Sequence, residues 1–402
     1  MQWRVTFWTM VVVQAILTAS FSISIPFLPL LIQQLGVHPL VQVEWWSGIA
    51  QSTSYLFLAF SSPFWGARAD RFGRKAMIVR AAICGAACSV LMGICVNVVE
   101  LIGARVLMGT FAGFGSAATA LVSSIVPGSM LGFALGWMAT AQMVGTLIGP
   151  LIGGAIADAV HDYRIVYYAT AAGTLLTGAL AWVFVRESFT PKPRGNKPAG
   201  KSGGGLREIL AHPEIVPLFA ILIVSQLTTL AVQPIVPLFV EAMAGPSPYI
   251  ATLAGAAFAV IGVGDLIASP FLGKRSDRIG YRRTVVICLC GAGLFTIPQA
   301  WAGNVWVFLA LRFGVGLFLG GIIPTTNAWI GRLFPRERHG AVYGLSYSAF
   351  FTGMFMGPLF GSTIAAWFGF GAVFFVTGGM ILANAAWVQF GLRTPESPRD
   401  WS

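Results

Sequence analysis

Charge is the property that this sequence has least of. Only 10% of its 402 residues are charged, whereas a soluble domain carries roughly 25% charged residues. Hydrophobic residues make up 56% of the chain, and its mean hydropathy is +0.78. These values exclude an ordinary soluble protein, and we predict an integral membrane protein with nearly all of its length in or beside a lipid bilayer.

Cysteine and histidine are also scarce, and neither type is arranged as a site. The four histidines lie in or near predicted loops and lack ligand spacing. The apolar runs contain no nucleophile–base set, metal cluster or phosphate-binding loop, so we predict no metal site, no cofactor and no enzyme. The five cysteines all lie within apolar runs, where they are interpreted as small hydrophobic residues and not as a disulfide framework: Cys84, Cys88, Cys95, Cys288 and Cys290.

Basic residues are more numerous, and their placement is more informative than their number. The formal net charge of +11 could suggest nucleic-acid binding. Of the 25 lysines and arginines, however, all but three are assigned to the two ends of the chain and to alternate loops. Arg164 alone falls on the other side, while Arg105 and Arg312 lie inside predicted spans. This asymmetry follows the positive-inside rule, places both termini in the cytoplasm and argues against a nucleic-acid partner.

A membrane-spanning helix needs about 20 mainly apolar residues. The first apolar run is long enough for a span, so it is not interpreted as a cleaved signal peptide. The predicted spans are 5–34, 45–66, 76–96, 98–122, 131–157, 164–186, 215–241, 250–273, 284–302, 305–331, 340–367 and 370–391. We therefore predict a six-helix bundle in residues 1–186 and a second one in residues 214–402. The connection 187–213, rich in proline, glycine and lysine, is predicted to be a flexible cytoplasmic linker between them.

An internal repeat supports this division. The stretch GARADRFGRK, Gly66–Lys75, returns in degenerate form as GKRSDRIGYRR, Gly273–Arg283, 207 positions later. Three other motifs recur at an offset of 207 or 208: Pro26 and Pro29 as Pro234 and Pro237; Arg105, Gly109 and Gly113 as Arg312, Gly316 and Gly320; and Gly145, Gly149, Pro150 and Gly153 as Gly353, Gly357, Pro358 and Gly361. A parallel duplication of this kind predicts two pseudo-symmetric halves with a substrate site between them, near the middle of the membrane.

Together these motifs resemble the major facilitator superfamily over essentially the whole chain. GARADRFGRK resembles the signature of the loop between its second and third helices, and Arg105–Gly109 resembles its fourth-helix arginine motif. The stretch Gly145–Gly154 resembles the fifth-helix motif of the drug:proton antiporter branch. IPFLPLLIQQLG and SPFWGARADRFGRK are similar to segments of bacterial MdtG-like multidrug exporters. The resemblance implies an all-α major facilitator fold with twelve transmembrane helices in two pseudo-symmetric bundles, located in a bacterial inner membrane.

The resemblance also implies a function. We expect a secondary active transporter that exports amphipathic drugs or toxic compounds by alternating access, is coupled to protons and works as a monomer. A transporter of a lipid or a small metabolite, including a sugar or a nucleoside, has the same fold and remains an alternative. A non-transporting membrane sensor is less favoured, because no soluble domain is attached to relay a signal.

The repeated loop is the first candidate functional element. Its arginines are costly in lipid and fix it on the cytoplasmic side, while its glycines allow a tight reversal. Asp70 is an acid within this basic cluster, and we predict that it pairs with a neighbouring arginine and faces the positive end of another helix. A topological turn with an incidental acid is the alternative. The predicted latch residues are Gly66, Asp70, Arg71, Gly73, Arg74, Gly273, Asp277 and Arg278.

Three charged residues are candidates for proton coupling, namely Asp265, Arg105 and Asp70. Asp265 alone among the 14 acidic residues lies well inside a predicted span. Arginine at a helix centre costs about 2.5–3.5 kcal/mol on insertion scales, so Arg105 should face a partner or water, and the resemblance assigns it a role in proton movement. Packing of Asp265 at a helix contact and snorkelling of Arg105 to the surface are the alternatives. Asp265 is predicted to lie on or beside a face of small residues: Gly255, Ala259, Gly262, Ser269 and Gly273.

Polar, aromatic and methionine side chains are candidates for substrate binding. The first span has no acid after Arg4 and offers a stripe of groups that form hydrogen bonds without titrating. The span 340–367 carries an aromatic and methionine stripe, typical of a promiscuous apolar pocket. Ordinary packing between helices is the alternative for each of them. The predicted substrate-binding residues are Gln14, Thr18, Ser22, Gln142, Met143, Gln226, Asn327, Tyr343, Tyr347 and Phe350.

Overall fold

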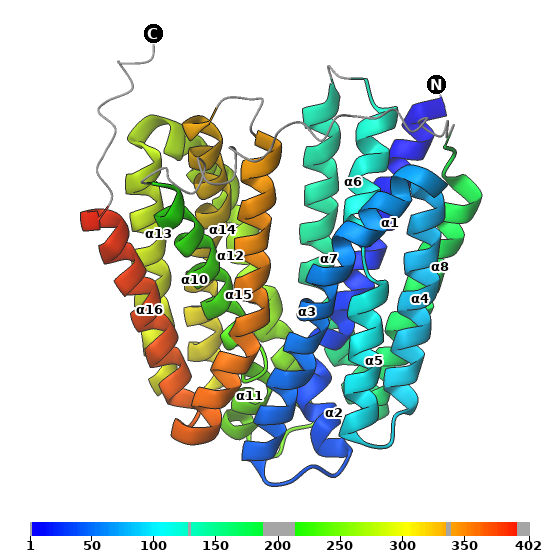
Figure 1. Cartoon of the computed structure of the whole chain (residues 1–402). Coiled ribbons are helices and arrows are strands. Elements are labelled where there is room, and N and C mark those ends of the chain that lie inside the picture. Colours follow the sequence, from blue (N-terminus) through cyan, green and yellow to red (C-terminus); the bar gives the residue numbers. More distant parts are fainter. Residues whose placement is uncertain (1, 128–129, 188–213, 335–338, 392–402) are drawn as a thin grey trace.

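The structure is a computed structural model that describes residues 2–127, 130–187, 214–334 and 339–391. These residues are helical almost throughout, and no strand occurs among them. Figure 1 shows long helices gathered into two groups, one built from α1–α8 and the other from α10–α16. The predicted all-α fold is confirmed.

Within the described residues, each half of the chain builds six helical rods. The first half consists of α1 (Gln2–Ser24) continued by η1 (Ile25–Phe27) and α2 (Leu28–Gln34), α3 (Leu40–Phe72), α4 (Arg74–Ile94), α5 (Val98–Phe111) followed by α6 (Phe114–Ile125), α7 (Leu131–Val160) and α8 (Arg164–Phe184). The second half consists of α10 (Ile215–Ala231) followed by α11 (Val236–Ala244), α12 (Ile250–Ile279), α13 (Tyr281–Thr296) continued by η3 (Ile297–Trp301), α14 (Val305–Leu333), α15 (His339–Phe368) and α16 (Phe370–Gly391).

Ten of these rods are long and apolar enough to cross a membrane by length and composition. The two that are not among them are α3 and the α5–α6 pair. The middle of α3 carries the polar run 51–54, Gln-Ser-Thr-Ser, which lowers its hydropathy. The α5 and α6 helices have only 14 and 12 residues, because the chain breaks between them.

Four of the predicted spans are interrupted or change helix type within their length. The first span narrows to a 3-10 turn at Pro26, and α11 and η3 begin beside Pro237 and Pro298. Proline has no N–H to donate and clashes with the preceding turn, so each helix restarts at these points. The fourth rod breaks at Gly113, whose φ of +119° lies in the left-handed region that favours glycine.

The two halves repeat each other in packing as well as in sequence. On α7, Gly145 lies so close to α1 that a Cβ on it would be 2.8 Å from the Thr18 Cβ. On α15, Gly353 lies against α10, and a Cβ on it would be 2.8 Å from the Gln226 Cβ. Both residues of the second pair follow those of the first by 208 positions. The contacts α1–α7 and α10–α15 are therefore equivalent, and the predicted pseudo-symmetry is confirmed.

The two ends of the molecule differ in how the halves meet. We call the end where α3 and α12 finish the basic end, and the end where they begin the far end. Near the basic end each half has its own apolar core, one around Met10 and Leu121 and the other around Leu218 and Ile330. At the far end one core is shared by both halves and includes Leu31, Val43, Leu101, Tyr167, Leu238 and Ala251. The halves are thus joined by apolar packing at the far end.

Candidate functional site

Asp265 lies on α12, where α12 contacts α14. Its side chain is half-buried, and Oδ1 points at Gly320, where any added side chain would collide with it. The small residues Gly255 and Gly262 face α7 instead. Asp265 is therefore beside the small-residue face. Within the described chain, no charged group or hydrogen-bond donor acts on its carboxyl. A carboxyl that is free in this way inside a span can take up and release a proton.

Arg105 lies on α5 and is directed into the first half. Its Nε is buried and has no hydrogen-bond partner in the described part of the chain. The guanidinium charge acts on the hydroxyl groups of Tyr55, on α3, and Tyr167, on α8. The Tyr167 hydroxyl is also buried without a hydrogen bond of acceptable geometry. This placement favours an interior role for Arg105 over snorkelling.

Arg312, the repeat counterpart of Arg105, is held differently. Its side chain is 4% exposed, and its Nε donates a hydrogen bond of 2.7 Å to the Ala257 carbonyl oxygen. The guanidinium lies 5.5 Å and 5.7 Å from the ring centroids of Phe308 and Phe258. A cavity of about 30 Å³ beside it is lined by other polar groups, including Gln299. A carbonyl and two aromatic faces thus stabilise this arginine inside the second half.

The predicted polar stripe on α1 is present, and its groups are already engaged. Gln14 Nε2 donates to Thr18 Oγ1 over 3.3 Å, and Thr18 Oγ1 donates to the Gln14 carbonyl oxygen over 2.8 Å. Thr18 contacts Gly145 of α7, and Ser22 contacts Gly149. The stripe therefore lies in part against α7, within the first half.

The other predicted substrate residues are spread over α7, α10, α14 and α15. Tyr343 of α15 donates from its hydroxyl to the Asn327 carbonyl oxygen of α14, over 3.3 Å. The Phe350 ring lies 6.0 Å from that of Phe351 in an edge-on arrangement, and Tyr347 is 64% exposed. Met143 and Gln226 are half-buried and Gln142 is exposed. These residues come from both halves, and the contacts that the structure describes among them do not join into one continuous cluster.

The repeated loops make the same turn. Gly73 ends α3 and Gly280 ends α12, with φ of +92° and +93°, a conformation that favours glycine. Gly66 lies within α3, and Arg71, Arg74 and Arg278 lie at the helix ends around the two turns. The side chains of Asp70 and Asp277, and the surroundings of Gly273, lie outside what the structure describes, so the latch pairing stays a prediction.

Two carboxylates that the sequence did not single out are bound to helix N-termini. The Glu187 carboxylate accepts hydrogen bonds from the backbone N–H groups of Arg74, at 3.0 Å, and Lys75, at 2.8 Å, at the start of α4. Its position after a span, in a segment predicted to be a linker, gave no sign of this contact. The carboxylate complements the positive end of the helix and satisfies two N–H groups that have no partner within it.

The second such carboxylate joins the two halves. Asp158, near the end of α7, accepts hydrogen bonds from the backbone N–H groups of Ala251, at 3.0 Å, and Thr252, at 2.7 Å, in the first turn of α12. One turn away, a Cβ on Gly154 would be 2.6 Å from the Ala251 carbonyl oxygen, and Gly255 lies directly against the Pro150 carbonyl oxygen. We call this α7–α12 contact at the far end the first seam.

A second seam joins α3 to α15 and is related to the first by the internal repeat. A Cβ on Gly48 would be 2.8 Å from the Pro358 carbonyl oxygen and 2.6 Å from the Ser362 Oγ. Gly48 and Pro358 are the repeat counterparts of Gly255 and Pro150. Nearby, Gln51 Nε2 donates a hydrogen bond of 2.6 Å to Gln233 Oε1, again between the halves. The two seams close the far end symmetrically, through backbone approaches that only glycine permits.

We expect Asp158→Asn to weaken the first seam. Asparagine retains one acceptor but loses the charge, and a carboxylate at a helix N-terminus contributes about 1–2 kcal/mol. The ratio of far-end-closed to far-end-open molecules should fall by roughly 5- to 30-fold. Spin labels at Val99→Cys and Trp306→Cys, exposed repeat counterparts at the far end, would report this as a shift to longer distances in a chain otherwise lacking cysteine. Glu241→Gln is the matched control, and equal distances in both variants would contradict the role of Asp158.

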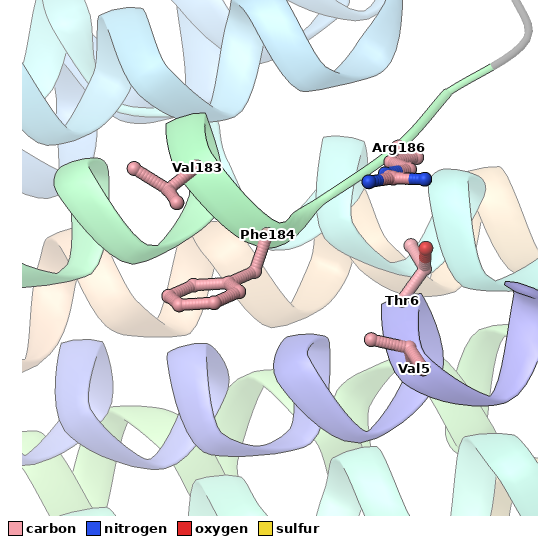
Figure 2. Close-up of a pocket in the computed structure, with 5 residues that line it drawn as sticks. All are labelled: Val5, Thr6, Val183, Phe184 and Arg186. Carbon is pink, nitrogen blue, oxygen red and sulfur yellow. The ribbon is translucent and has the colours of Figure 1, made fainter.

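A pocket of about 220 Å³ opens at the basic end, between α1 and the end of α8. Figure 2 shows Thr6 and Arg186 facing the same space, beside the apolar side chains of Val5, Val183 and Phe184. All of these residues belong to the first half. The pocket therefore lies apart from both seams and from the helix contacts that hold Asp265 and Arg105.

Comparison with known proteins gives a consistent result. A sequence profile described as Major Facilitator Superfamily matches residues 10–264 and 219–402. Multidrug resistance protein MdtG of Salmonella typhimurium is 36% identical over 379 residues, which cover 93% of this chain and 92% of that protein. The inward-facing, unoccupied structure of a bacterial homologue of the human lysosomal transporter Spinster is similar with a TM-score of 0.78 at 14% identity, covering 98% of this chain and 99% of that one. A D-xylose–proton symporter gives a TM-score of 0.75 at 14% identity, covering 98% of each chain.

Proposed function

Because this chain belongs to the major facilitator superfamily and is a secondary transporter in the membrane, we propose that it exports amphipathic drugs or other toxic compounds in exchange for protons. The kind of substrate is proposed from the similarity to multidrug resistance proteins over nearly the whole of both chains. The same similarity favours drug export over the alternative of a lipid or metabolite transporter.

One observation supports alternating access. The halves share an apolar core and two glycine seams at the far end, whereas each has a core of its own at the basic end. We propose that residues 1–186 and 214–402 rock as two bundles about a site between them, connected by the linker 187–213. Because the basic end carries the arginine-rich loops, it is proposed to face the cytoplasm, together with both termini, in a bacterial inner membrane. The structure then represents a state closed to the outside.

Proton coupling is proposed to depend on Asp265, with Arg105 in the first half. Asp265 has no hydrogen-bond donor or counter-charge among the described residues, so protonation can change its interaction with α14. Asp70 is proposed to act as a cytoplasmic latch that forms when the basic end closes. The candidates on α1, α7, α10, α14 and α15 supply the sparse polar and aromatic contacts that suit amphipathic molecules. We propose that a single copy of the chain carries out the cycle.

Transport of a fluorescent cationic dye by purified protein in proteoliposomes tests this proposal. We expect accumulation against the dye gradient when a pH gradient is imposed and only equilibration when it is collapsed. Empty liposomes and a seam-locked variant, with Gln51→Cys and Gln233→Cys joined by a short thiol cross-linker, are the controls. Accumulation that does not depend on the pH gradient would contradict proton coupling. Failure of several chemically different dyes to exchange at all would contradict drug export.

A further inference from the structure

The second seam contains a buried acid, Glu44, which belongs to neither the Asp265 nor the Arg105 contacts. Its side chain is only 4% exposed, and Oε2 is buried without a hydrogen-bond partner within the described chain. Glu44 lies one turn into α3 and one residue before the predicted span 45–66. Glu44 is therefore not among the acids predicted to lie inside spans.

The helix spacing places Glu44 on the face of α3 that meets the other half. Gly48 and Gln51 follow it at four and seven residues, so all three lie on one side of the helix. Gly48 contacts Ser362 of α15, and Gln51 donates to Gln233 of the second half. Opening the second seam must therefore move the surroundings of Glu44.

The internal repeat gives the same position independently. The counterpart of Glu44 in the second half is Ala251, whose carbonyl oxygen lies against Gly154 in the first seam. The counterpart of Gly154 is Ser362. Glu44 is thus expected to pack against Ser362, whose Oγ is likewise buried and has no hydrogen-bond partner in the described residues. Two polar side chains without a hydrogen-bond partner among the described residues therefore belong to one tightly packed seam.

The carboxyl groups of the two seams have opposite surroundings. Asp158 accepts two backbone N–H hydrogen bonds, which suit an ionised carboxylate. Glu44 receives no such donor at Oε2, and burial without a partner disfavours the ionised form strongly. In the closed far end, Asp158 therefore holds the first seam through two backbone hydrogen bonds, and Glu44 fits the second seam only as a neutral acid.

Charged neighbours do not change this balance. Burial is the only influence on the Glu44 carboxyl among the described residues. The α2 helix and the part of α15 beyond residue 353 carry no titratable group, α6 carries none and α4 carries only thiols at this end. Glu100 on α5 is bound to the backbone of residue 96, Arg105 on α5 acts on two tyrosines, and Glu241 on α11 and the exposed His38 before α3 have no effect on it.

We propose that Glu44 is a proton-binding residue of the far end, protonated while the second seam is closed and exchanging its proton with the medium on that side when the seam opens. The proposal rests on the alternating access proposed above. An ionised Glu44 favours the open far end, where water solvates it, and uptake of one proton from that side allows the seam to close. The pH on that side would then set how readily the empty transporter closes its far end, whereas the proton that crosses the membrane is proposed to be carried through Asp265.

Distance measurements between spin labels at Val99→Cys and Trp306→Cys, in lipid nanodiscs without substrate, test this proposal. For the otherwise native sequence without cysteine, we expect the ratio of closed to open far ends to rise as pH falls, by up to about tenfold per pH unit for one coupled proton. Glu44→Gln imitates the neutral acid and should stay closed at every pH. Glu44→Asp keeps a titratable group and should keep the pH dependence. The control Glu241→Gln should behave as the parent does.

Infrared difference spectra between the open and closed states give a second readout, which does not require Glu44→Gln to fold. The signal of a protonated carboxyl should accompany closure in the parent protein and change in position in Glu44→Asp. A pH dependence of closure as steep in Glu44→Gln as in the parent would overturn the proposal, as would a carboxyl signal that is the same in the parent and in Glu44→Asp. Because no dye is present, these outcomes are independent of whether the proposed drug export holds.

Discussion

Asp265→Asn should allow dye to equilibrate across the membrane but prevent a pH gradient from concentrating it. The carboxyl lies against Gly320, where the contact between α12 and α14 leaves room for little else. Asparagine has nearly the same shape, so this contact and the fold should persist. It cannot exchange a proton, so the two conformations would no longer differ in the protons that they bind at this position.

Parallel measurements in proteoliposomes separate these effects. Passive exchange should stay within about twofold of the parent, while gradient-driven accumulation should fall by at least roughly tenfold, the equivalent of 1.4 kcal/mol of lost coupling. Glu100→Gln, which removes an exposed acid at the far end, is the matched control for a lost negative charge. If Asp265→Asn concentrates dye as the parent does, Asp265 is a packing residue, and coupling must depend on another group.

The sequence was sufficient to predict the helical rods and their duplication, because both follow from local hydropathy and from motifs that recur at one offset. The helix breaks were harder to predict, because nothing in the sequence separates Gly113 from glycines that lie inside continuous helices. Only its φ of +119° in the structure distinguishes it. Pro150 and Pro358 lie inside continuous helices, whereas Pro26 accompanies a break. Tertiary packing decides between these outcomes.

The contacts of several charged groups also could not be predicted from the sequence. Asp158 and Glu187 bind backbone N–H groups of helices that are distant in sequence, a contact that no side-chain motif encodes. Arg80 was grouped with the loop arginines although it falls within the predicted span 76–96. It lies within α4, 3.4 Å from the centroid of the Trp65 ring, with Nε and Nη1 buried and unpaired in the described chain. Glu44 was missed because a span boundary was drawn one residue after it. A span drawn from hydropathy ends where charges begin, so it can exclude a buried charge at its edge, as it did here.

Arg105→Ala should abolish accumulation of dye in proteoliposomes, leaving only the passive level. The arginine is directed into the first half, and its charge acts on the hydroxyls of Tyr55 and Tyr167. Tyr167 is fully buried, so removing the guanidinium leaves a cavity beside a hydroxyl that has no other partner in the described residues. We therefore expect both a lost charge in the first half and a loosened contact between α3, α5 and α8.

Two further variants separate the charge from the packing. Arg105→Lys keeps the charge and should retain part of the accumulation, whereas Arg105→Gln keeps much of the volume without the charge and should behave as Arg105→Ala does. The repeat counterpart provides the control for a buried arginine as such, because Arg312 is bound to a carbonyl and two phenylalanine rings. Arg312→Lys should lower thermal stability more than it lowers coupling. Full accumulation by Arg105→Gln at matched stability would show that the fourth rod contributes packing alone, and that the charge needed for coupling lies in the second half.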